Sequence, residues 1–210
     1  MTILAFEFSS EQRSVALARE GRVLAEAAES GGYRVTHAFG LVEKALADAK
    51  VLREEVEVIA VGLGPGSYTG IRAAIALAQG WQLARNVQLL GISSSECLAA
   101  QAQAEKIFGR VNVVIDAQRG EYYLAGWDIS SAERREISPL KIVAATEIEA
   151  RKAAGETCVG PVVGRILFPA AAMVARLAAS RKNYAAGEKL EPIYLRETAF
   201  VKAPPVMRTY

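Results

Sequence analysis

The sequence predicts an α/β protein built from two similarly organised halves. Segments rich in Val and Ile alternate with segments whose apolar residues recur at helical spacing. Each half also opens with an apolar strand that ends in an acid and leads into a hairpin, with Glu7 in the first half and Asp116 in the second. This repeated order favours an internal pseudo-repeat whose break falls near residues 103–109.

The first half opens with three strands. Residues 3–8 are apolar apart from Glu7, which is typical of a buried strand, and Glu20-Gly21 is an acid–glycine pair of the kind that turns a hairpin. Thr36 is suited to cap a helix, and Phe39 begins a run of apolar residues at helical spacing. The predicted elements are strands 3–8, 14–19, 22–28, 56–63 and 88–92 and helices 36–50, 71–85 and 93–106, with a Gly-rich loop at 64–70.

The second half repeats this order with shorter helices. Strand 111–116 ends in Asp116, and Gln118-Arg119-Gly120 supplies the turn of a hairpin. Pro169 is predicted at a first helical position, where its missing N–H is not needed. The predicted elements are strands 111–116, 121–127, 137–143 and 157–160 and helices 146–154 and 170–181.

Composition excludes several classes of protein. Of the 210 residues, 51% are hydrophobic and 23% are charged, which excludes a disordered or linker protein. A formal net charge of +2 is low for a protein that holds a nucleic-acid backbone by itself. One His and two Cys are too few for a four-ligand Cys/His zinc site.

The start of the chain and its apolar stretches predict a cytoplasmic protein. Residues 1–7 contain no basic region and include an acid, unlike a signal peptide. Charged or amide side chains interrupt every long apolar stretch, so no membrane span is expected. We therefore expect Cys97 and Cys158 to be reduced residues of the core.

The Gly-rich segment 64–70 lies between a predicted strand and a predicted helix, but no nucleotide-binding consensus fits it. A P-loop requires Gly-Lys at a fixed spacing, and no Lys follows Gly64 or Gly66 there. The G-x-G-x-x-G spacing fails at Ser67 and Thr69. Two interpretations remain: the loop offers N–H groups to an anion beside a helix N-terminus, or its glycines only allow a tight turn and close backbone packing.

Glu7 and Asp116 are acids at strand ends, where each can hold Mg²⁺ or its waters beside a phosphate. Alternatively, each accepts hydrogen bonds from N–H groups of the following turn. His37 is the only histidine, and no G-x-S-x-G sequence accompanies it, so a surface or interface position is favoured over hydrolase chemistry. Helix 71–85 is apolar nearly all round, which indicates a central core helix or one covered on its second side by another subunit.

Four segments of the chain, in the same order, resemble the TsaB (YeaZ) family. The longest reads Gly-Leu-Gly-Pro-Gly-Ser-Tyr-Thr-Gly-Ile-Arg and spans residues 62–72. The others are residues 3–10 with the strand after them, residues 116–123, and the C-terminal segment Glu-Pro-Ile-Tyr-Leu-Arg at residues 191–196. Together the segments span most of the chain, and the longest is too specific for a chance match.

The resemblance implies the actin/Hsp70/sugar-kinase (ASKHA) fold, with two related subdomains at 1–104 and 105–210, each a mixed β-sheet flanked by helices. It implies a non-catalytic scaffold or activator subunit in the formation of threonylcarbamoyladenosine at the tRNA adenosine 3′ of the anticodon. The implied partners are a TsaD-type transferase subunit and a TsaE-type ATPase. TsaD-type subunits hold a metal through H-x-x-x-H, which a chain with one His cannot supply. We expect a homodimer when the chain is alone, contact with tRNA only through the complex, and no membrane contact.

The resemblance also implies a nucleotide cleft and a pairing surface, but no catalytic or metal-binding residue and no required cofactor. Glu7 stands where the family usually has Asp, and Gln118 replaces a commoner Arg, which weakens the case for ATP or ADP with Mg²⁺. The candidate nucleotide-binding residues are Glu7, Ser9, Ser10, Gly64, Gly66, Ser67, Thr69 and Asp116. The candidate pairing residues, on helices 36–50 and 71–85, are His37, Leu41, Ile71, Arg72, Ile75 and Gln79, and a charge at Ile75 is expected to weaken pairing without unfolding the chain.

The alternative function is a stand-alone ATPase or small-molecule kinase of the same fold. It would use Glu7, Asp116 and the loop Gly64–Gly70. A peptidase finds no support, since the sequence offers neither a metal-ligand set nor a nucleophile with a base.

Overall fold

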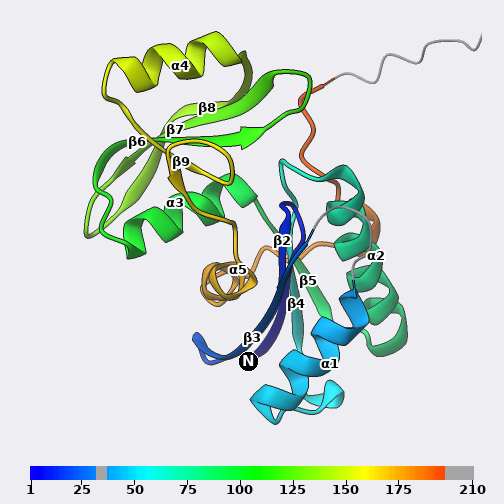
Figure 1. The fold of residues 1–210 in the computed structure, drawn as a ribbon. Coiled ribbons are helices and arrows are strands. Elements are labelled where there is room, and N and C mark those ends of the chain that lie inside the picture. Colours follow the sequence, from blue (N-terminus) through cyan, green and yellow to red (C-terminus); the bar gives the residue numbers. More distant parts are fainter. Residues whose placement is uncertain (32–36, 197–210) are drawn as a thin grey trace, which may run out of the picture.

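Two five-stranded sheets with the same strand order form the framework of the computed structural model, which describes residues 1–31 and 37–196 (Figure 1). In each sheet the first three strands pair antiparallel, and two further strands add in parallel. This repetition confirms the predicted fold class and the pseudo-repeat. The first sheet has the order β3 (Arg22–Ser30), β2 (Gln12–Arg19), β1 (Thr2–Glu7), β4 (Val58–Gly62), β5 (Gln88–Ile92), and the second has β8 (Arg134–Ala144), β7 (Glu121–Ile129), β6 (Gly109–Asp116), β9 (Thr157–Gly160), β10 (Arg165–Ile166).

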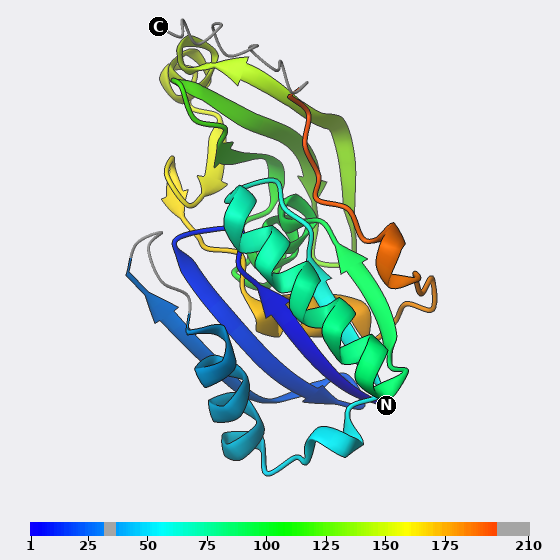
Figure 2. The ribbon, with the colours of Figure 1, turned by 90° about the vertical axis from the view of Figure 1, so that its right-hand side faces the viewer.

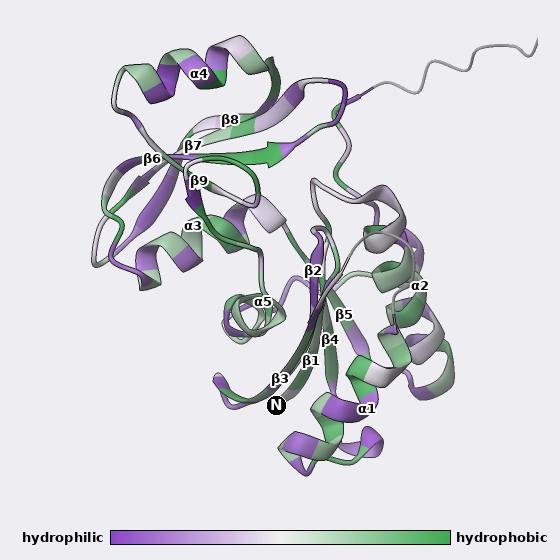
Figure 3. Cartoon of the chain, in the orientation of Figure 1, coloured by the Kyte–Doolittle hydropathy of each residue, from purple (hydrophilic) through white to green (hydrophobic). Residues whose placement is uncertain are grey.

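Helices cover both faces of the first sheet because side chains alternate along its strands. Leu4 and Phe6 of β1 pack on one face with α1 (Ala38–Ala49) and α2 (Tyr68–Arg85). Ile3 and Ala5 pack on the other face with α5 (Ala171–Ala178). Figure 3 shows the apolar strands between these two helical layers. Two 3₁₀ turns, η1 (Arg53–Glu55) and η2 (Gly187–Lys189), complete this half of the molecule.

The two halves exchange helices across the middle of the molecule. α3 (Ser94–Ala104) follows β5 in the chain but packs against β6 and β7 of the second sheet, whose other face is covered by α4 (Ala145–Ala153). α5 follows β10 but packs on the first sheet. Glu96 of α3 pairs with Arg134 at 3.6 Å and with Arg181. In the sequence, every strand of the first sheet precedes residue 104 and every strand of the second sheet follows it. The division of the chain into two subdomains at that residue stays a prediction.

Several predicted boundaries move in the structure. α2 begins at Tyr68 rather than Ile71, because the Ser67 hydroxyl accepts a hydrogen bond from the Gly70 N–H at 3.3 Å and caps the helix. Pro169 precedes the N-cap Ala170 instead of entering α5. The predicted cap at Thr36 lies outside the described residues. β10 and both 3₁₀ turns were not expected, because two- and three-residue elements carry no periodicity. Within 1–31 and 37–196 no helix is long and apolar enough to cross a membrane.

Two glycines of α2 are expected to respond oppositely to alanine. A Cβ at Gly70 would lie 2.0 Å from the Phe8 carbonyl oxygen, whereas a Cβ at Gly80 would meet nothing within 4 Å. Gly70→Ala should therefore lower the free energy of unfolding by about 2 to 3 kcal/mol, and Gly80→Ala should raise it by about 1 kcal/mol. Urea unfolding of both variants measures this difference. Equal effects at the two positions would contradict the close contact between α2 and the end of β1.

Candidate functional site

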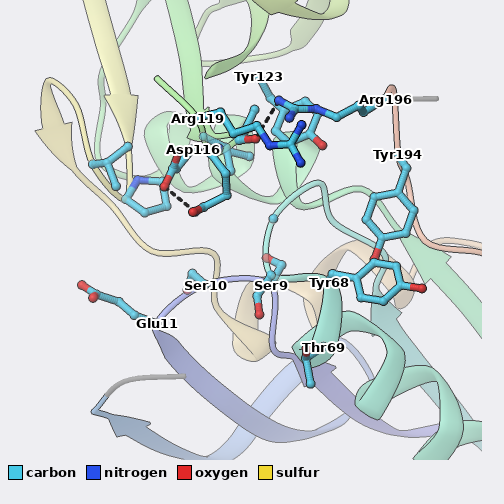
Figure 4. Close-up of a pocket in the computed structure, with 17 residues that line it drawn as sticks. Ser9, Ser10, Glu11, Tyr68, Thr69, Asp116, Arg119, Tyr123, Tyr194 and Arg196 are labelled. Atoms are coloured by element: carbon cyan, nitrogen blue, oxygen red, sulfur yellow. Dashed lines mark hydrogen bonds between the residues drawn. The ribbon is translucent and has the colours of Figure 1, made fainter. Parts of the chain in front are cut away.

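A cavity of about 890 Å³ opens between the two sheets (Figure 4). The first sheet contributes the turn after β1 and the start of α2, and the second contributes the β6–β7 hairpin. The C-terminal segment adds Tyr194 and Arg196. The two loops that the sequence singles out therefore face one cavity. Six candidate nucleotide-binding residues line it, namely Ser9, Ser10, Gly66, Ser67, Thr69 and Asp116, whereas Glu7 and Gly64 do not.

The Gly-rich loop is held against the turn after β1. The Ser67 N–H donates to the Ser9 carbonyl at 2.7 Å. A Cβ at Gly66 would lie 2.1 Å from that same oxygen, and the φ of Gly66 is +148°. The lack of a side chain at Gly66 therefore lets the loop backbone approach the backbone of Ser9 closely. The Ser67 N–H is already hydrogen-bonded within the chain. Of the two interpretations of this loop, close packing is the one with direct structural support.

Glu7 is fully buried beneath the loop and does not line the cavity. Its Oε1 accepts from the Ser9 N–H at 2.8 Å, and its Oε2 accepts from the Ser94 hydroxyl at 2.9 Å. The Ser94 hydroxyl in turn accepts from the Gly64 N–H at 3.2 Å. Glu7 therefore does not reach the cavity in this structure, and its assignment to nucleotide or Mg²⁺ binding stays a prediction that the cavity lining does not support.

The environment of Glu7 affects its protonation. Burial raises the pKa of the Glu7 carboxyl, and hydrogen bonds from Ser9 and Ser94 oppose that rise. Gly62 makes room for the carboxylate, since a Cβ there would lie 2.0 Å from Glu7 Oε2. The site is thus built for one buried carboxyl with specific donors.

Asp116 lines the cavity, but its carboxylate is also engaged. Oδ1 accepts from the Gln118 N–H and Oδ2 from the Gln118 side-chain amide, both at 2.7 Å. Among the described residues no group of three His, Cys, Asp or Glu side chains is placed to hold a metal ion. Because Mg²⁺ beside a nucleotide needs only one or two carboxylates together with phosphate oxygens, binding of a nucleotide with Mg²⁺ in this cleft stays a prediction.

Sequence reasoning missed the aromatic and basic side chains of the cavity. The Tyr194 ring lies 5.0 Å from the Tyr68 ring at an interplanar angle of 32°. Within residues 1–31 and 37–196 the buried Tyr194 hydroxyl has no hydrogen-bond partner, and burial raises the pKa of Tyr194 to about 12. Arg119 of the β6–β7 hairpin and Arg196 of the C-terminal segment both line the cavity on the side of the second sheet (Figure 4). Tyr194 and Arg196 belong to the segment 191–196, which resembles a family motif. The sequence does not indicate that this segment lies at the cavity.

Three of the six candidate pairing residues are buried inside the chain. Leu41, Ile71 and Ile75 belong to the core between α1, α2 and the first sheet. This corrects their assignment to a partner surface, because helix 71–85 is apolar nearly all round and its pattern does not indicate which face meets the sheet. The expectation that Ile75→Glu leaves the fold intact is also wrong, since the side chain is 6% exposed and a charge there would enter the core.

The other three candidates have different surroundings. The Gln79 side-chain amide donates to the Gly187 carbonyl at 2.9 Å, so it fastens η2 to α2. His37 is exposed beside Glu29, at 3.5 Å. Arg72 is exposed and lies over the Tyr68 ring, 5.2 Å from its centroid. A partner can therefore reach His37 and Arg72.

Variants of Glu7 should separate a structural carboxyl from a catalytic one. The folded chain holds the Glu7 proton to higher pH than the unfolded chain, whose carboxyl keeps its ordinary pKa of 4.5. The free energy of unfolding should therefore fall as pH rises from 4.5 through the raised pKa. Glu7→Gln cannot titrate and should lack this decline. Glu7→Ala cannot titrate either, and at low pH, where the Glu7 carboxyl is protonated, it should cost about 2 to 4 kcal/mol because it leaves a cavity and an unpaired Ser9 N–H. This cost should become smaller as pH rises.

Urea unfolding between about pH 5 and pH 8 measures both effects. Parallel pH curves for the unsubstituted chain and Glu7→Gln would contradict this account of Glu7.

Comparison with known proteins places the chain in a family. The family model "TsaD: tRNA N6-adenosine threonylcarbamoyltransferase" matches residues 35–185. The TsaB protein of Escherichia coli K12, named for tRNA threonylcarbamoyladenosine biosynthesis, is 33% identical over 125 residues, which cover 60% of this chain and 54% of that protein. The TsaB protein of Bacillus subtilis 168 is 30% identical over 140 residues, covering 66% of this chain and 60% of the relative. The matches thus span little more than half the length of these relatives.

Solved structures extend the similarity to nearly the whole chain. YeaZ from Pseudomonas aeruginosa has a TM-score of 0.75 at 28% identity, covering 92% of this chain and 99% of that one. A second structure, described as an uncharacterized protein with similarity to peptidase YeaZ from the same organism, has a TM-score of 0.77 at 25% identity, covering 93% and 99%. With the family model matching well over half of its residues, the chain belongs to the TsaB (YeaZ) family of TsaD-related proteins.

Proposed function

We propose that this chain is a non-catalytic subunit in the formation of threonylcarbamoyladenosine in tRNA. It would pair with a TsaD-type transferase subunit and a TsaE-type ATPase, in the cytoplasm, to modify the adenosine 3′ of the anticodon. Family membership carries the proposal, since two TsaB relatives are named for this biosynthesis and two YeaZ structures share the fold. The net charge of +2 supports tRNA contact through the complex rather than through this chain.

The cavity supports a scaffold more than an enzyme. The alternative of a stand-alone ATPase or kinase needs Glu7 and Asp116 to face a metal-bound phosphate. Glu7, however, lies buried outside the cavity and is bonded to Ser9 and Ser94, and Asp116, which lines the cavity, is bonded to Gln118. With a single histidine the chain also cannot form the H-x-x-x-H motif of TsaD-type subunits.

The outer face of α1 and α2 is the proposed pairing surface, for a TsaD-type subunit or for a second copy. Phe39 of α1 is 74% exposed, although helical spacing suggested that it faces the core, and Leu83 of α2 is 90% exposed. Between Arg72 and Leu83 the exposed positions of α2 are the small residues Ala76 and Gly80, which let a facing helix approach closely. A standard interface of about 800 Å² per partner would cover this face.

Leu83→Glu should weaken pairing without affecting the fold. Its exposed side chain contributes little to the core, so the free energy of unfolding should change by less than about 0.5 kcal/mol. A charge facing an apolar partner surface should weaken binding by about tenfold or more. The matched control is Ile166→Glu, which adds the same charge at a 53% exposed apolar position of the second sheet. Analytical ultracentrifugation and calorimetric titration with a TsaD-type subunit measure pairing, and equal effects of the two variants would refute this surface.

Reconstitution tests the function itself. Purified TsaD-type and TsaE-type subunits, tRNA and threonylcarbamoyl-adenylate should form modified tRNA rapidly only when this chain is added. Leu83→Glu should lower the rate of tRNA modification when the concentration of this chain is limiting. Glu7→Gln is expected to keep the fold and should therefore support modification. The stand-alone enzyme predicts instead steady phosphate release by the isolated chain that Glu7→Gln abolishes. Modification at the same rate without the chain would contradict the proposed role.

A further inference from the structure

The C-terminal segment 191–196 connects the two sheets on one side of the cavity. Figure 2 shows it rising from η2 beside the first sheet to the second sheet. The Ile193 N–H donates to the Leu63 carbonyl, just after β4, at 2.8 Å. The Arg196 guanidinium donates to the Ala117 carbonyl at 3.1 Å and pairs with Glu121 in the β6–β7 hairpin. About 10 Å of extended chain thus separates an attachment on one sheet from an attachment on the other.

The middle of this segment rests on the first turn of α2. The Tyr194 ring stacks against Tyr68, with 5.0 Å between the ring centroids. One helical turn later, Arg72 donates to the Tyr68 hydroxyl at 3.1 Å. Tyr68 is 55% exposed, and Arg72 lies on the exposed face of the helix. A continuous set of contacts therefore leads from the outer face of α2 to Tyr194.

One side chain of the docked segment, Tyr194, favours release of the segment from the position described. In the part of the chain that the structure describes, the buried Tyr194 hydroxyl has no hydrogen-bond partner. An unpaired buried hydroxyl raises the free energy of the docked segment, because release returns that group to water. Arg196 and Glu121 are both partly exposed, so their ion pair adds only modest stability. The docked position is thus held weakly enough for a contact elsewhere to shift it.

We propose that residues 193–196 form a strap whose attachment to the β6–β7 hairpin is coupled, through Tyr194 and Tyr68, to the outer face of α2. Displacing Tyr68 loosens the strap, and with it the cavity wall formed by Tyr194 and Arg196. Coupling is reciprocal, so the strap also affects the affinity of whatever binds at Tyr68 and Arg72. The coupling is a property of the isolated chain; its use by a pairing partner rests on the function proposed above.

A double-mutant cycle in the isolated chain tests the coupling, read by hydrogen exchange of the hairpin amides at residues 117–121. Arg196→Met removes the attachment and should speed exchange by about tenfold. Tyr68 hydrogen-bonds to Arg72 and not to the hairpin. Tyr68→Ala should nevertheless speed exchange of the hairpin amides by about threefold or more, through the strap. In the double variant exchange should be no faster than in Arg196→Met alone. Hairpin exchange unchanged by Tyr68→Ala, or two effects that multiply, would overturn the strap.

Two controls separate the strap from general loosening of the fold. Leu195→Ala changes a 44% exposed side chain within the same segment and should leave hairpin exchange unchanged. Tyr194→Phe keeps the ring and removes only the unpaired hydroxyl, so exchange should stay equal or become slower. Faster exchange in either control, at unchanged global stability, would also overturn the strap.

Addition of a TsaD-type subunit tests the link to pairing. When it binds, hairpin exchange in the unsubstituted chain should change by about twofold or more and should not change in Arg196→Met. Binding without any change in hairpin exchange would refute the transmission to the partner. Absence of binding would count against the proposed function alone, because the cycle in the isolated chain decides the strap independently.

Discussion

The buried carboxylate of Glu7 is the interaction on which the rest of the site depends. It ends β1 and joins two other parts of the first half, the start of α3 through Ser94 and the Gly-rich loop through the Ser94 hydroxyl and Gly64. A buried carboxyl without donors would cost several kcal/mol, so the Ser9 N–H and the Ser94 hydroxyl are required with it. Gly62 is required as well, because any side chain there would overlap the carboxylate.

Both acids at the strand ends, Glu7 and Asp116, accept hydrogen bonds from neighbouring residues of the chain. Glu7 accepts hydrogen bonds below the loop, and Asp116 accepts them from Gln118 within its own turn. The cavity that these two strand ends border is lined by the aromatic and basic side chains Tyr68, Tyr123, Tyr194, Arg119 and Arg196 as well as by the acids Glu11 and Asp116.

Local pattern was sufficient to predict most of the fold and only part of the site. Strands and hairpins follow from Val-rich segments and from turns such as Glu20-Gly21, where both residues have positive φ. The inward direction of Glu7 was not predictable, because its partner Ser94 is 87 residues away. The exposed side of α2 was not predictable either, since a helix apolar all round has no distinct polar face. Phe39 shows the converse, since it stands at helical spacing with the buried residues of α1 and is nevertheless 74% exposed in the first turn of that helix.

The pseudo-repeat explains why one helix serves several roles. Strands β4 and β5 are joined through α2, whereas the equivalent strands β9 and β10 are joined by residues 161–164 alone. The second half therefore lacks a counterpart of α2, and the cleft has a long helix on only one side. The first turn of that helix reaches the cavity, and its outer face is exposed. Tyr68 contacts Tyr194 of the C-terminal segment, and Gln79 holds η2, which precedes that segment. A partner that covers the first turn of α2 therefore meets Tyr68, whose ring contacts Tyr194 of the strap.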